Sequence, residues 1–406
     1  MSSSSTVLPP PTERYAVLRW LKQNLLGSWR DVVLTLLGIY IVVNIVVPVV
    51  RWVLTEANWA VVTTNMRLLM VGQYPIEQVW RIWACVLLLA LLIGLSWGLW
   101  ISKSIGDTGG RSRLVGIILL LVPPLFALFP NGIESLPMLL SVSVLGLIGY
   151  LAATVLTTQQ SLLKRLTTLG WIVYIPICYV LIRGLGDLLP VVSSNLWGGL
   201  LLTLLLTAVG IVLSFPLGVL LALGRRSQLP VIKWFCIAYI EVIRGVPLIT
   251  VLFMAQLVLP LFLPQSIEID RVVRAMAGIT LFSAAYLAEN VRGGLQNIPR
   301  GQYEAAEALG LNAVQKMTLI ILPQALRIIV PILVGQFISL FKDTSLVTIV
   351  SLLDLLGIAN TVLAQPNFIG TQREVYFFIG VIYWLISYTI SALGKRLELR
   401  QQMSAI

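Results

Sequence analysis

Long apolar segments separated by short polar stretches run along almost the whole chain. Each segment is close to the roughly 20 residues that a helix needs to cross about 30 Å of hydrocarbon. The pattern therefore predicts an all-α polytopic membrane protein. The ten predicted spans are residues 33–53, 82–101, 114–129, 136–157, 171–188, 197–223, 237–263, 274–290, 325–341 and 375–394.

Two of these spans are weaker predictions because prolines interrupt them. A Pro-Pro pair breaks the segment 114–129, and Pro176 together with Arg183 breaks 171–188. If both were absent, eight spans would remain with the same orientation. The number of spans is therefore about ten, or alternatively eight.

Lysine and arginine are unevenly distributed between the connecting segments. With the N-terminus in the cytoplasm, the cytoplasmic segments hold 19 of these residues and the opposite segments hold 8. Positive residues concentrate in the cytoplasmic loops of membrane proteins. The sequence therefore predicts that both termini and the stretch 291–327 are cytoplasmic.

The chain divides near residue 190, where weaker spans give way to a compact unit of five spans. Gly94 and Gly98, before this point, match the small-xxx-small pattern of helix packing. No inverted repeat relates the two halves, which weakens the interpretation as a secondary transporter. The predicted parts are a cytoplasmic tail (1–31), a transmembrane extension (32–190), a transmembrane domain (191–396) and a second cytoplasmic tail (397–406).

Composition supports the membrane assignment and excludes several functions. Apolar residues make up 58% of the chain and charged residues 11%, whereas soluble proteins have about 25% charged residues. With no histidine, no paired carboxylates and no metal-ligand cluster, neither a metal site nor a catalytic residue is expected. The cytoplasmic loops explain the net charge of +11 without nucleic acid. The cysteines, Cys85, Cys178 and Cys236, lie in or beside apolar runs, which indicates buried thiols.

One polar segment, residues 299–323, differs from its surroundings. A Glu- and Ala-rich run, 304–308, predicts a short helix. Gly310 fits a left-handed C-terminal cap, and Asn312 followed by Gln315 fits a capping box for a second helix. The prediction is two short helices bent at a glycine and held against the cytoplasmic face.

The same segment has the features of a docking surface. Ala305 and Ala306 leave room for a partner's backbone, and Glu304 and Glu307, one turn apart, could meet basic groups on that partner. The alternative is an amphipathic hairpin lying on lipid. Helices on lipid favour Lys and Arg on their polar face, whereas this one is acidic and Ala-rich at its start, which argues against the alternative.

The spacing within this segment resembles the EAA loop of ABC importer permeases. The pattern is Glu-Ala-Ala, three residues, Gly, nine residues, Ile, one residue and Leu-Pro, and every position is present. The resemblance implies a coupling helix that docks on a cytoplasmic ATPase dimer and transmits its closure to the spans. The implied docking residues are Glu304, Ala305, Ala306, Glu307, Gly310, Ile320, Leu322 and Pro323.

Other stretches of the C-terminal half resemble the polar amino-acid branch of these importers, with the five-helix core of type I permeases. The N-terminal extension, with WGGLLLTLLL and GRRSQLP, is similar to the larger M-type permeases of general L-amino-acid importers of the histidine/glutamine type. The stretches in the C-terminal half are IEVIRGVPLITVLF (240–253), YLAENVRGGLQNIPRGQYEAAEALGL (286–311) and LFKDTSLVTIVSLLDL (340–355).

Features that the sequence lacks point to partner proteins. It has no G-x-x-x-x-G-K-[ST] phosphate loop, so no cofactor is expected in this chain, and ATP and magnesium are expected on a separate ATPase. No soluble stretch is long enough for a substrate-binding domain, which implies a separate extracytoplasmic amino-acid-binding protein. The resemblance also implies a second permease, related but different, and a location in the bacterial cytoplasmic (inner) membrane.

Charged residues at membrane depth are costly, so each carries a functional hypothesis. Glu241 and Arg244 lie one turn apart before a Gly-Pro break, and they form either a helix-end ion pair or a gate at the mouth of the pathway. Glu289, Asn290 and Arg292 end the span before the EAA pattern. They either anchor that span at the interface or form a polar joint that transmits movement of the loop.

A polar group also precedes the apolar run 346–358, which is too short to span and is predicted to be a re-entrant or buried helix. In this group Asp343 or Thr344 could cap the helix. A helix N-terminus with Lys342 suits a substrate carboxylate, and Asp343 suits an ammonium group. The alternative is that Lys342 and Asp343 pair with each other and cap the helix. Ser345 completes the group.

The sequence as a whole predicts the permease subunit of an ATP-driven amino-acid importer, with Gln336 and Tyr286 as further pathway candidates. The alternative is a stand-alone secondary transporter or channel for small polar solutes. It would need ion-coupling carboxylates at the midplane, whereas the candidates lie at span ends. An integral membrane enzyme would lack reactive groups. The amino acid carried, the identity of the second permease, the role of residues 1–190 and the presence of a substrate site in this chain stay open.

Overall fold

The structure is a computed structural model that describes residues 25–101, 136–156, 159–186, 189–264 and 266–403. These residues form helices, with two isolated β-bridges and no strand among them. They belong to two compact units, Met1–Trp59 and Ala60–Ile406. Within the described ranges, eight helices are long and apolar enough to cross a membrane, or nine if a bent helix pair is one span. The all-α membrane class is confirmed.

The first unit contains one long helix, Trp29–Glu56. Ser28 begins it, because its hydroxyl oxygen accepts a hydrogen bond from the Asp31 N–H at 3.3 Å. None of its most apolar residues is buried within the unit, as expected for a helix that lipid surrounds. The predicted span 33–53 is confirmed. The helix comprises α2 (Trp29–Ile41), a π-helical turn (Val42–Val46), α3 (Val47–Arg51) and a second π-helical turn (Trp52–Glu56).

Three long helices of the second unit come from the predicted extension. A Cβ on Gly94 of α6 would lie 2.0 Å from the Gly146 carbonyl oxygen of α8, so the two backbones are in contact as the small-residue pattern predicts. α9 is continuous although it contains Pro176. The spans 82–101, 136–157 and 171–188 are confirmed, and 114–129 lies outside the described residues. The elements are a 3-10 turn (Ile76–Gln78), α6 (Val79–Ser96), a π-helical turn (Trp97–Ile101), α8 (Leu136–Val155) and α9 (Gln160–Arg183).

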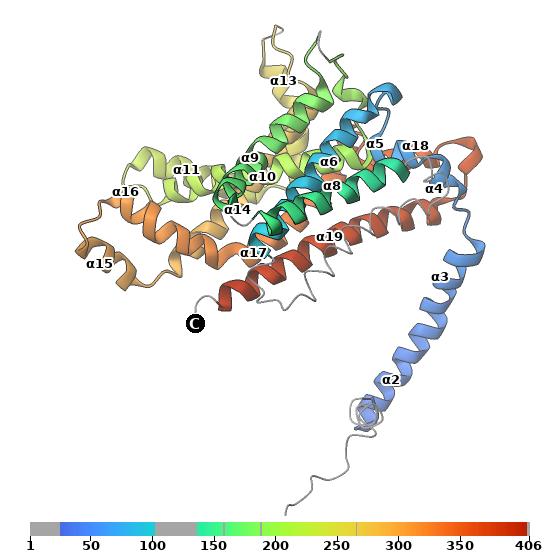
Figure 1. Ribbon diagram of the computed structural model, residues 1–406, viewed down its shortest axis with the longest axis horizontal. Helices are drawn as coiled ribbons and strands as arrows, with labels where there is room; N and C mark the ends of the chain where they lie inside the picture. Colours follow the sequence, from blue (N-terminus) through green and yellow to red (C-terminus); the bar gives the residue numbers. More distant parts are fainter. Residues whose placement is uncertain (1–24, 102–135, 157–158, 187–188, 265, 404–406) are drawn as a thin grey trace, which may run out of the picture. The chain divides into compact units, whose positions relative to one another are not determined.

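Four long helices make up most of the C-terminal half of the second unit (Figure 1). α10 and α14 pack closely, with Gly218 of α10 against Leu287 of α14, and α17 contacts both α14 and α19. Asp270 begins α14 by accepting a hydrogen bond from the Val272 N–H at 2.8 Å. These helices confirm four more predicted spans. Their bounds are α10 (Gly199–Arg225), α14 (Arg271–Gln296), α17 (Leu322–Asp343) and α19 (Gln372–Met403).

The predicted span 237–263 corresponds to a helix pair that bends by 108° at the Gly-Pro break, and it forms either one broken span or a re-entrant loop. The break follows from Pro247, which has no N–H to donate and disfavours helical geometry at the residue before it. Val246 accordingly adopts an extended conformation, with φ −115° and ψ 148°. The parts are α11 (Pro230–Gly245), α12 (Leu248–Phe253), a π-helical turn (Met254–Val258) and α13 (Leu259–Phe262).

The predicted re-entrant or buried helix 346–358 is not a single helix, because two elements occupy this run, although the second of them is largely buried. A 3-10 helix, Thr344–Val350, continues from α17, and the chain then turns at Ser351 with φ 62°. Asp354 starts the next helix, because its Oδ1 accepts the Gly357 N–H at 3.0 Å. Apolar residues on both sides of the turn hid the break from the hydrophobic pattern. The second helix is α18 (Leu355–Leu363).

At one end of the second unit, part of the extension packs into the core. We call residues 60–74, 194–199 and 351–371 the distal rim, which lies opposite α15 and α16 in Figure 1. Asn65 is buried, and its Oδ1 accepts a hydrogen bond from the Gln365 Nε2 of the C-terminal half at 3.1 Å. The rim thus ties the extension to the core. Its elements are α4 (Ala60–Thr64), α5 (Met66–Val71), two 3-10 turns (Ser194–Leu196 and Pro366–Phe368) and α18.

Candidate functional site

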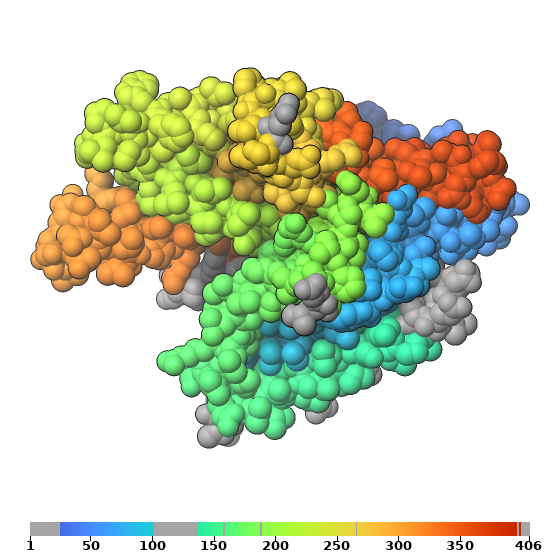
Figure 2. Space-filling view, turned by 90° about the horizontal axis from the view of Figure 1, so that it is seen from above, coloured from blue at the N-terminus to red at the C-terminus, as the bar shows by residue number. Residues whose placement is uncertain are grey.

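The segment 299–323, which we call the EAA segment, protrudes from the other end of the second unit (orange in Figure 2). Its first helix, α15 (Arg300–Ala308), stops where Gly310 takes φ +72°. The Gly310 N–H donates to the Glu307 carbonyl at 2.9 Å, and the Leu311 N–H donates to the Ala306 carbonyl at 3.2 Å. These bonds form a Schellman cap, so the predicted left-handed cap at Gly310 is confirmed.

The second half of the segment begins with the predicted capping box. The Asn312 Oδ1 accepts the Gln315 N–H at 2.9 Å, and the Gln315 Oε1 accepts the Asn312 N–H at 3.0 Å. The helix does not end at Pro323, because a π-helical turn accommodates the proline and joins α17. The prediction of two short helices is therefore wrong for the second one. It comprises α16 (Ala313–Gln315), the π-helical turn (Lys316–Ile321) and α17.

The predicted docking residues point in different directions. Glu304 and Ala305 are exposed, whereas Ala306 is only 2% exposed. The prediction that Ala306 faces a partner is therefore wrong, because its small side chain lies inside the folded segment. The remaining positions range from half-buried to exposed, and they are Ile320, Leu322 and Pro323.

Glu307 is engaged within the segment instead of being free for a partner. Its carboxylate forms an ion pair with Lys316, which joins α15 to the helix after the glycine turn. Glu304 has no such pair among the described residues. Leu309 and Val314 are 76% and 70% exposed and add apolar surface to the segment.

Five charged side chains gather where α10, α11 and α14 meet. Arg225 pairs with Glu241 at 2.9 Å and with Glu289 at 3.6 Å. Arg244 lies 3.8 Å from Glu289, and the Arg292 Nε donates to Glu289 at 2.9 Å. The alternative in which Glu241 and Arg244 pair with each other is wrong, because each bonds to another helix. We call these five residues the charge cluster.

The charge cluster is partly exposed and carries a surplus positive charge. The side chains of Arg225, Arg244 and Glu289 are 25%, 33% and 22% exposed. Single pairs of this kind contribute about 0–1 kcal/mol, so the cluster is strong only as a network. The Arg244 guanidinium also lies 5.5 Å from the ring centre of Tyr286, a cation–π contact.

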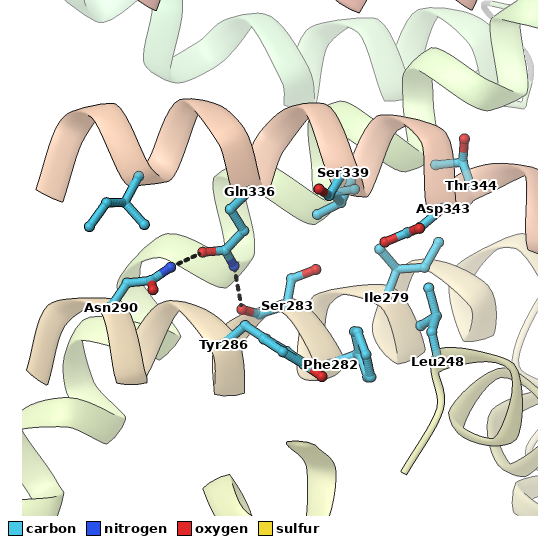
Figure 3. Close-up of a pocket in the computed structure, with 12 residues that line it drawn as sticks. Leu248, Ile279, Phe282, Ser283, Tyr286, Asn290, Gln336, Ser339, Asp343 and Thr344 are labelled. Atoms are coloured by element: carbon cyan, nitrogen blue, oxygen red, sulfur yellow. Dashed lines mark hydrogen bonds between the residues drawn. The ribbon is translucent and has the colours of Figure 1, made fainter. Parts of the chain in front are cut away.

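A cavity of about 410 Å³ lies beside α14 and α17, and Tyr286 is part of its wall (Figure 3). Gln336 bridges the two helices across it. Its Oε1 accepts from the Asn290 Nδ2 at 2.6 Å, and its Nε2 donates to the Ser283 carbonyl at 3.0 Å. The lining residues are Leu248, Ile279, Phe282, Ser283, Tyr286, Asn290, Ile332, Gln336, Ser339, Leu340, Asp343 and Thr344.

The group before the 3-10 helix is only partly in the cavity. Asp343 and Thr344 line it, whereas Lys342 is exposed and does not. Since α17 continues directly into the 3-10 helix, no free helix N-terminus lies beside Lys342, and neither the Asp343 nor the Thr344 side chain accepts a capping hydrogen bond. No salt bridge joins Lys342 to Asp343 in the described part of the chain. The Ser345 hydroxyl donates to the Lys342 carbonyl at 2.8 Å.

Ser283 and Ser339 line the cavity but were not among the predicted site residues, although the sequence contains a signal for both. Polar residues 283, 286 and 290 recur at intervals of three and four, and so do 336, 339 and 343. Such intervals place side chains on one face of a helix. Two polar stripes on otherwise apolar spans therefore mark the two walls of the cavity.

Comparison with known proteins identifies the family to which this chain belongs. Residues 214–402 match the family described as binding-protein-dependent transport system inner membrane component. The inner membrane amino-acid ABC transporter permease protein YhdY of Escherichia coli is 36% identical over 397 residues, which cover 94% of this chain and 92% of that protein. This chain belongs to the amino-acid ABC transporter permeases.

Two other relatives separate the core of the permease from its extension. The glutamate/glutamine/aspartate/asparagine transport system permease protein BztC of Rhodobacter capsulatus is 36% identical over 419 residues, 96% of this chain and 95% of that protein. The glutamate/aspartate import permease protein GltK of Escherichia coli is 41% identical over 207 residues, 50% of this chain but 91% of that protein. Half of this permease thus corresponds to almost the whole of GltK, and the remainder is shared with YhdY and BztC.

Proposed function

We propose that this permease carries amino acids through the cavity beside α14 and α17, and that a separate ATPase drives the movement by binding the EAA segment. One observation carries the proposal. A single helix runs from Ala313 in the EAA segment to Asp343 in the cavity wall. At 1.5 Å per residue this helix is about 45 Å long. A displacement of the segment can therefore reach the cavity wall through one continuous helix.

The exposed side of the EAA segment supports binding to the ATPase. Glu304 offers a negative charge, Ala305 allows close approach of a backbone, and Leu309 offers an apolar side chain. The caps on both sides of Gly310 hold the turn in one conformation, which lowers the entropy lost on binding. In this proposal the ATPase dimer binds ATP and magnesium, while the permease holds no cofactor and has no catalytic residue.

The chemistry of the cavity supports a polar amino acid as substrate. The Asp343 carboxylate suits an α-ammonium group, and the polar groups of Ser339 and Asn290 suit a carboxylate. The volume of about 410 Å³ is within the range of small-molecule pockets, about 300–1,000 Å³. BztC is named for glutamate, glutamine, aspartate and asparagine transport. We infer that this permease carries general polar L-amino acids.

The complete importer in this proposal contains further chains. A second permease, related but different, pairs with this one in the bacterial inner membrane, and an extracytoplasmic binding protein delivers the amino acid. The EAA segment and both termini lie in the cytoplasm. The excess of Lys and Arg in the corresponding segments, 19 against 8, supports this orientation.

Gly310→Val tests the role of the EAA segment, with Gly301→Val as its control. Both glycines have no other atom within 4 Å of an added Cβ, but only Gly310 has a positive φ. Purified complexes in liposomes would be assayed for ATP-driven amino-acid uptake. Gly310→Val should lower uptake about tenfold or more, because a β-branched residue disrupts the turn. Gly301→Val should keep most of it.

Unchanged ATP-driven uptake by the Gly310→Val complex would count against docking through this segment. Uptake by the permease alone, without any ATPase or ATP, would instead support the stand-alone transporter. Co-purification from the native membrane provides a second readout. Recovery of an ATPase and a second permease is expected with the unmodified chain, and less ATPase is expected with Gly310→Val.

A further inference from the structure

Two adjacent arginines at the end of α10 bind in different directions. Arg225 reaches the charge cluster, where it pairs with Glu241 at 2.9 Å and with Glu289 at 3.6 Å. Arg226 reaches the EAA segment, where its Nη1 donates to the Tyr303 hydroxyl at 3.4 Å. Its guanidinium also lies 6.0 Å from the centre of the Tyr303 ring. The dipeptide Arg225-Arg226 therefore contacts both the charge cluster and the EAA segment.

The backbone around this dipeptide is held in place. The Arg226 N–H donates to the Leu223 carbonyl at 3.0 Å, and the Ser227 N–H donates to the Gly224 carbonyl at 3.0 Å. The Ser227 hydroxyl accepts the Leu229 N–H at 3.1 Å. These bonds fix the turn between α10 and α11. A shift of one arginine therefore moves the other.

The charge cluster in turn borders the cavity. The guanidinium of Arg244 packs on the ring of Tyr286, and Tyr286 lines the cavity. Arg244 also lies in the last turn of α11, just before the break, and Leu248 at the start of α12 lines the cavity as well. The buried Nε of Arg244 has no hydrogen-bond partner, so this guanidinium has an unused donor. Two parts of the cavity wall thus depend on where Arg244 lies.

We propose that Arg225 and Arg226 are positioning residues that link the EAA segment to the Tyr286 side of the cavity. The link runs from Tyr303 through the two arginines to Glu289, and from there to Arg244. It is separate from the continuous helix α17, which reaches the opposite wall. Movement of the EAA segment therefore acts on both walls together. This inference rests on the proposed function, because it assumes that an ATPase moves the segment.

The strength of the contacts suits a link that rearranges in each cycle. All three arginines around Glu289 compete for one carboxylate, and the side chains are partly exposed. A pair of this kind exchanges partners at small cost, whereas a fully buried pair would not. In this structure Arg225 is shared between the carboxylates of Glu241 and Glu289. A second arrangement of the cluster requires only that Arg225 lose one of these two ion pairs.

The test compares Arg225→Gln, Arg226→Gln and the double variant in the purified complex. The measured quantity is the number of amino acids transported per ATP hydrolysed. Each single variant should lower this ratio about five- to tenfold, while ATP hydrolysis continues. Because the two residues act in series, the double variant should be no worse than the worse single variant. Arg226→Lys should recover part of the ratio, since it keeps the charge over Tyr303.

Two controls separate this role from simple destabilisation. Lys233→Gln removes an exposed cation of α11 that lies outside the EAA segment and the charge cluster and has no ion pair among the described residues, and it should leave the ratio unchanged. Tyr303→Phe keeps the ring but removes the hydroxyl, and it should have an effect in the same direction as Arg226→Gln. All variants should retain the melting temperature and the amount of bound ATPase of the unmodified complex.

Several outcomes would overturn the inference. An unchanged ratio in both single variants would do so, and so would losses that multiply in the double variant, because independent effects multiply. Failure of the proposed function has a different signature, since uptake by the unmodified complex would then not depend on ATP. That result would remove the basis of this inference as well. A normal unmodified complex with insensitive variants would reject the link alone.

Discussion

The EAA segment and the distal rim both turn at glycines with positive φ, but their surroundings are opposite. At Gly310 an added Cβ would meet nothing within 4 Å. At Gly72 it would lie 2.5 Å from the Cα of Gly198, and at Gly199 it would lie 2.2 Å from the Leu69 carbonyl oxygen. Gly310 of the EAA segment is needed for backbone geometry alone, whereas Gly72 and Gly199 of the rim are needed for both geometry and contact.

This difference distinguishes a segment that is available to a partner from a contact that holds two parts of the chain together. The EAA segment gets its shape from local hydrogen bonds, so it can stand away from the bundle and be available to a partner. The rim gets its shape from residues far apart in the chain, such as Gly72 bridging to Trp197 and Gly199 bridging to Asp354. A stable contact between the extension and the core requires such long-range contacts, which local hydrogen bonds alone do not provide.

The largest expected effect is that of Gly72→Ala in the rim. A positive φ costs an alanine about 1–2 kcal/mol, and overpacking against a backbone adds about 1–3 kcal/mol. The free energy of unfolding should therefore fall by about 2–5 kcal/mol. Thermal melting of the purified permease in detergent measures this loss.

Gly38→Ala is the matched control for that substitution. Gly38 lies within a helix of the first unit, with nothing within 4 Å of an added Cβ and no positive φ. Alanine is the better helix former by about 1 kcal/mol, so this variant should melt at the same temperature or slightly higher. A Gly72→Ala variant as stable as Gly38→Ala would show that the rim contact is loose.

The sequence predicted the fold well wherever one physical signal dominated. Hydropathy found the described spans, because a helix in lipid must be apolar along its whole length. It did not record the bend within 237–263 or the turn within 346–358, because the run is apolar on both sides of each break. The information in those places lies in single residues, Pro247 and Asp354, whose effects the apolar pattern does not record.

The candidate site was predictable in its local parts and unpredictable in its long-range parts. The caps at Gly310 and Asn312 involve neighbours in the chain, so their residue types revealed them. The partners of Glu241 and Arg244 lie on other helices, and hydrophobic periodicity does not say which charged groups meet. The distal rim has the same character, because contact between Gly72 and Gly198 depends on how distant segments pack.

Gly310→Ala should have a smaller effect on stability than Gly72→Ala. Only the positive φ opposes the new methyl group, which costs about 1–2 kcal/mol. Its effect on coupling should nevertheless exceed that of Gly72→Ala in complexes that fold, because the turn aims the exposed side of the segment. Melting temperature and transport per ATP, measured on the same preparation, test both statements. Equal losses of stability in the two variants would erase the distinction between the segment and the rim.

The smallest expected effect is that of Glu307→Gln, which removes the ion pair with Lys316. The Glu307 side chain is 61% exposed, and exposed pairs contribute about 0–1 kcal/mol, so the loss of stability should be at the lower end of that range. Lys316→Gln should have the same effect, and high salt should remove the difference from the unmodified chain. Melting curves at low and high salt measure it. A loss as large as that of Gly310→Ala would mean that charge, and not the caps on either side of the glycine, holds the segment in shape.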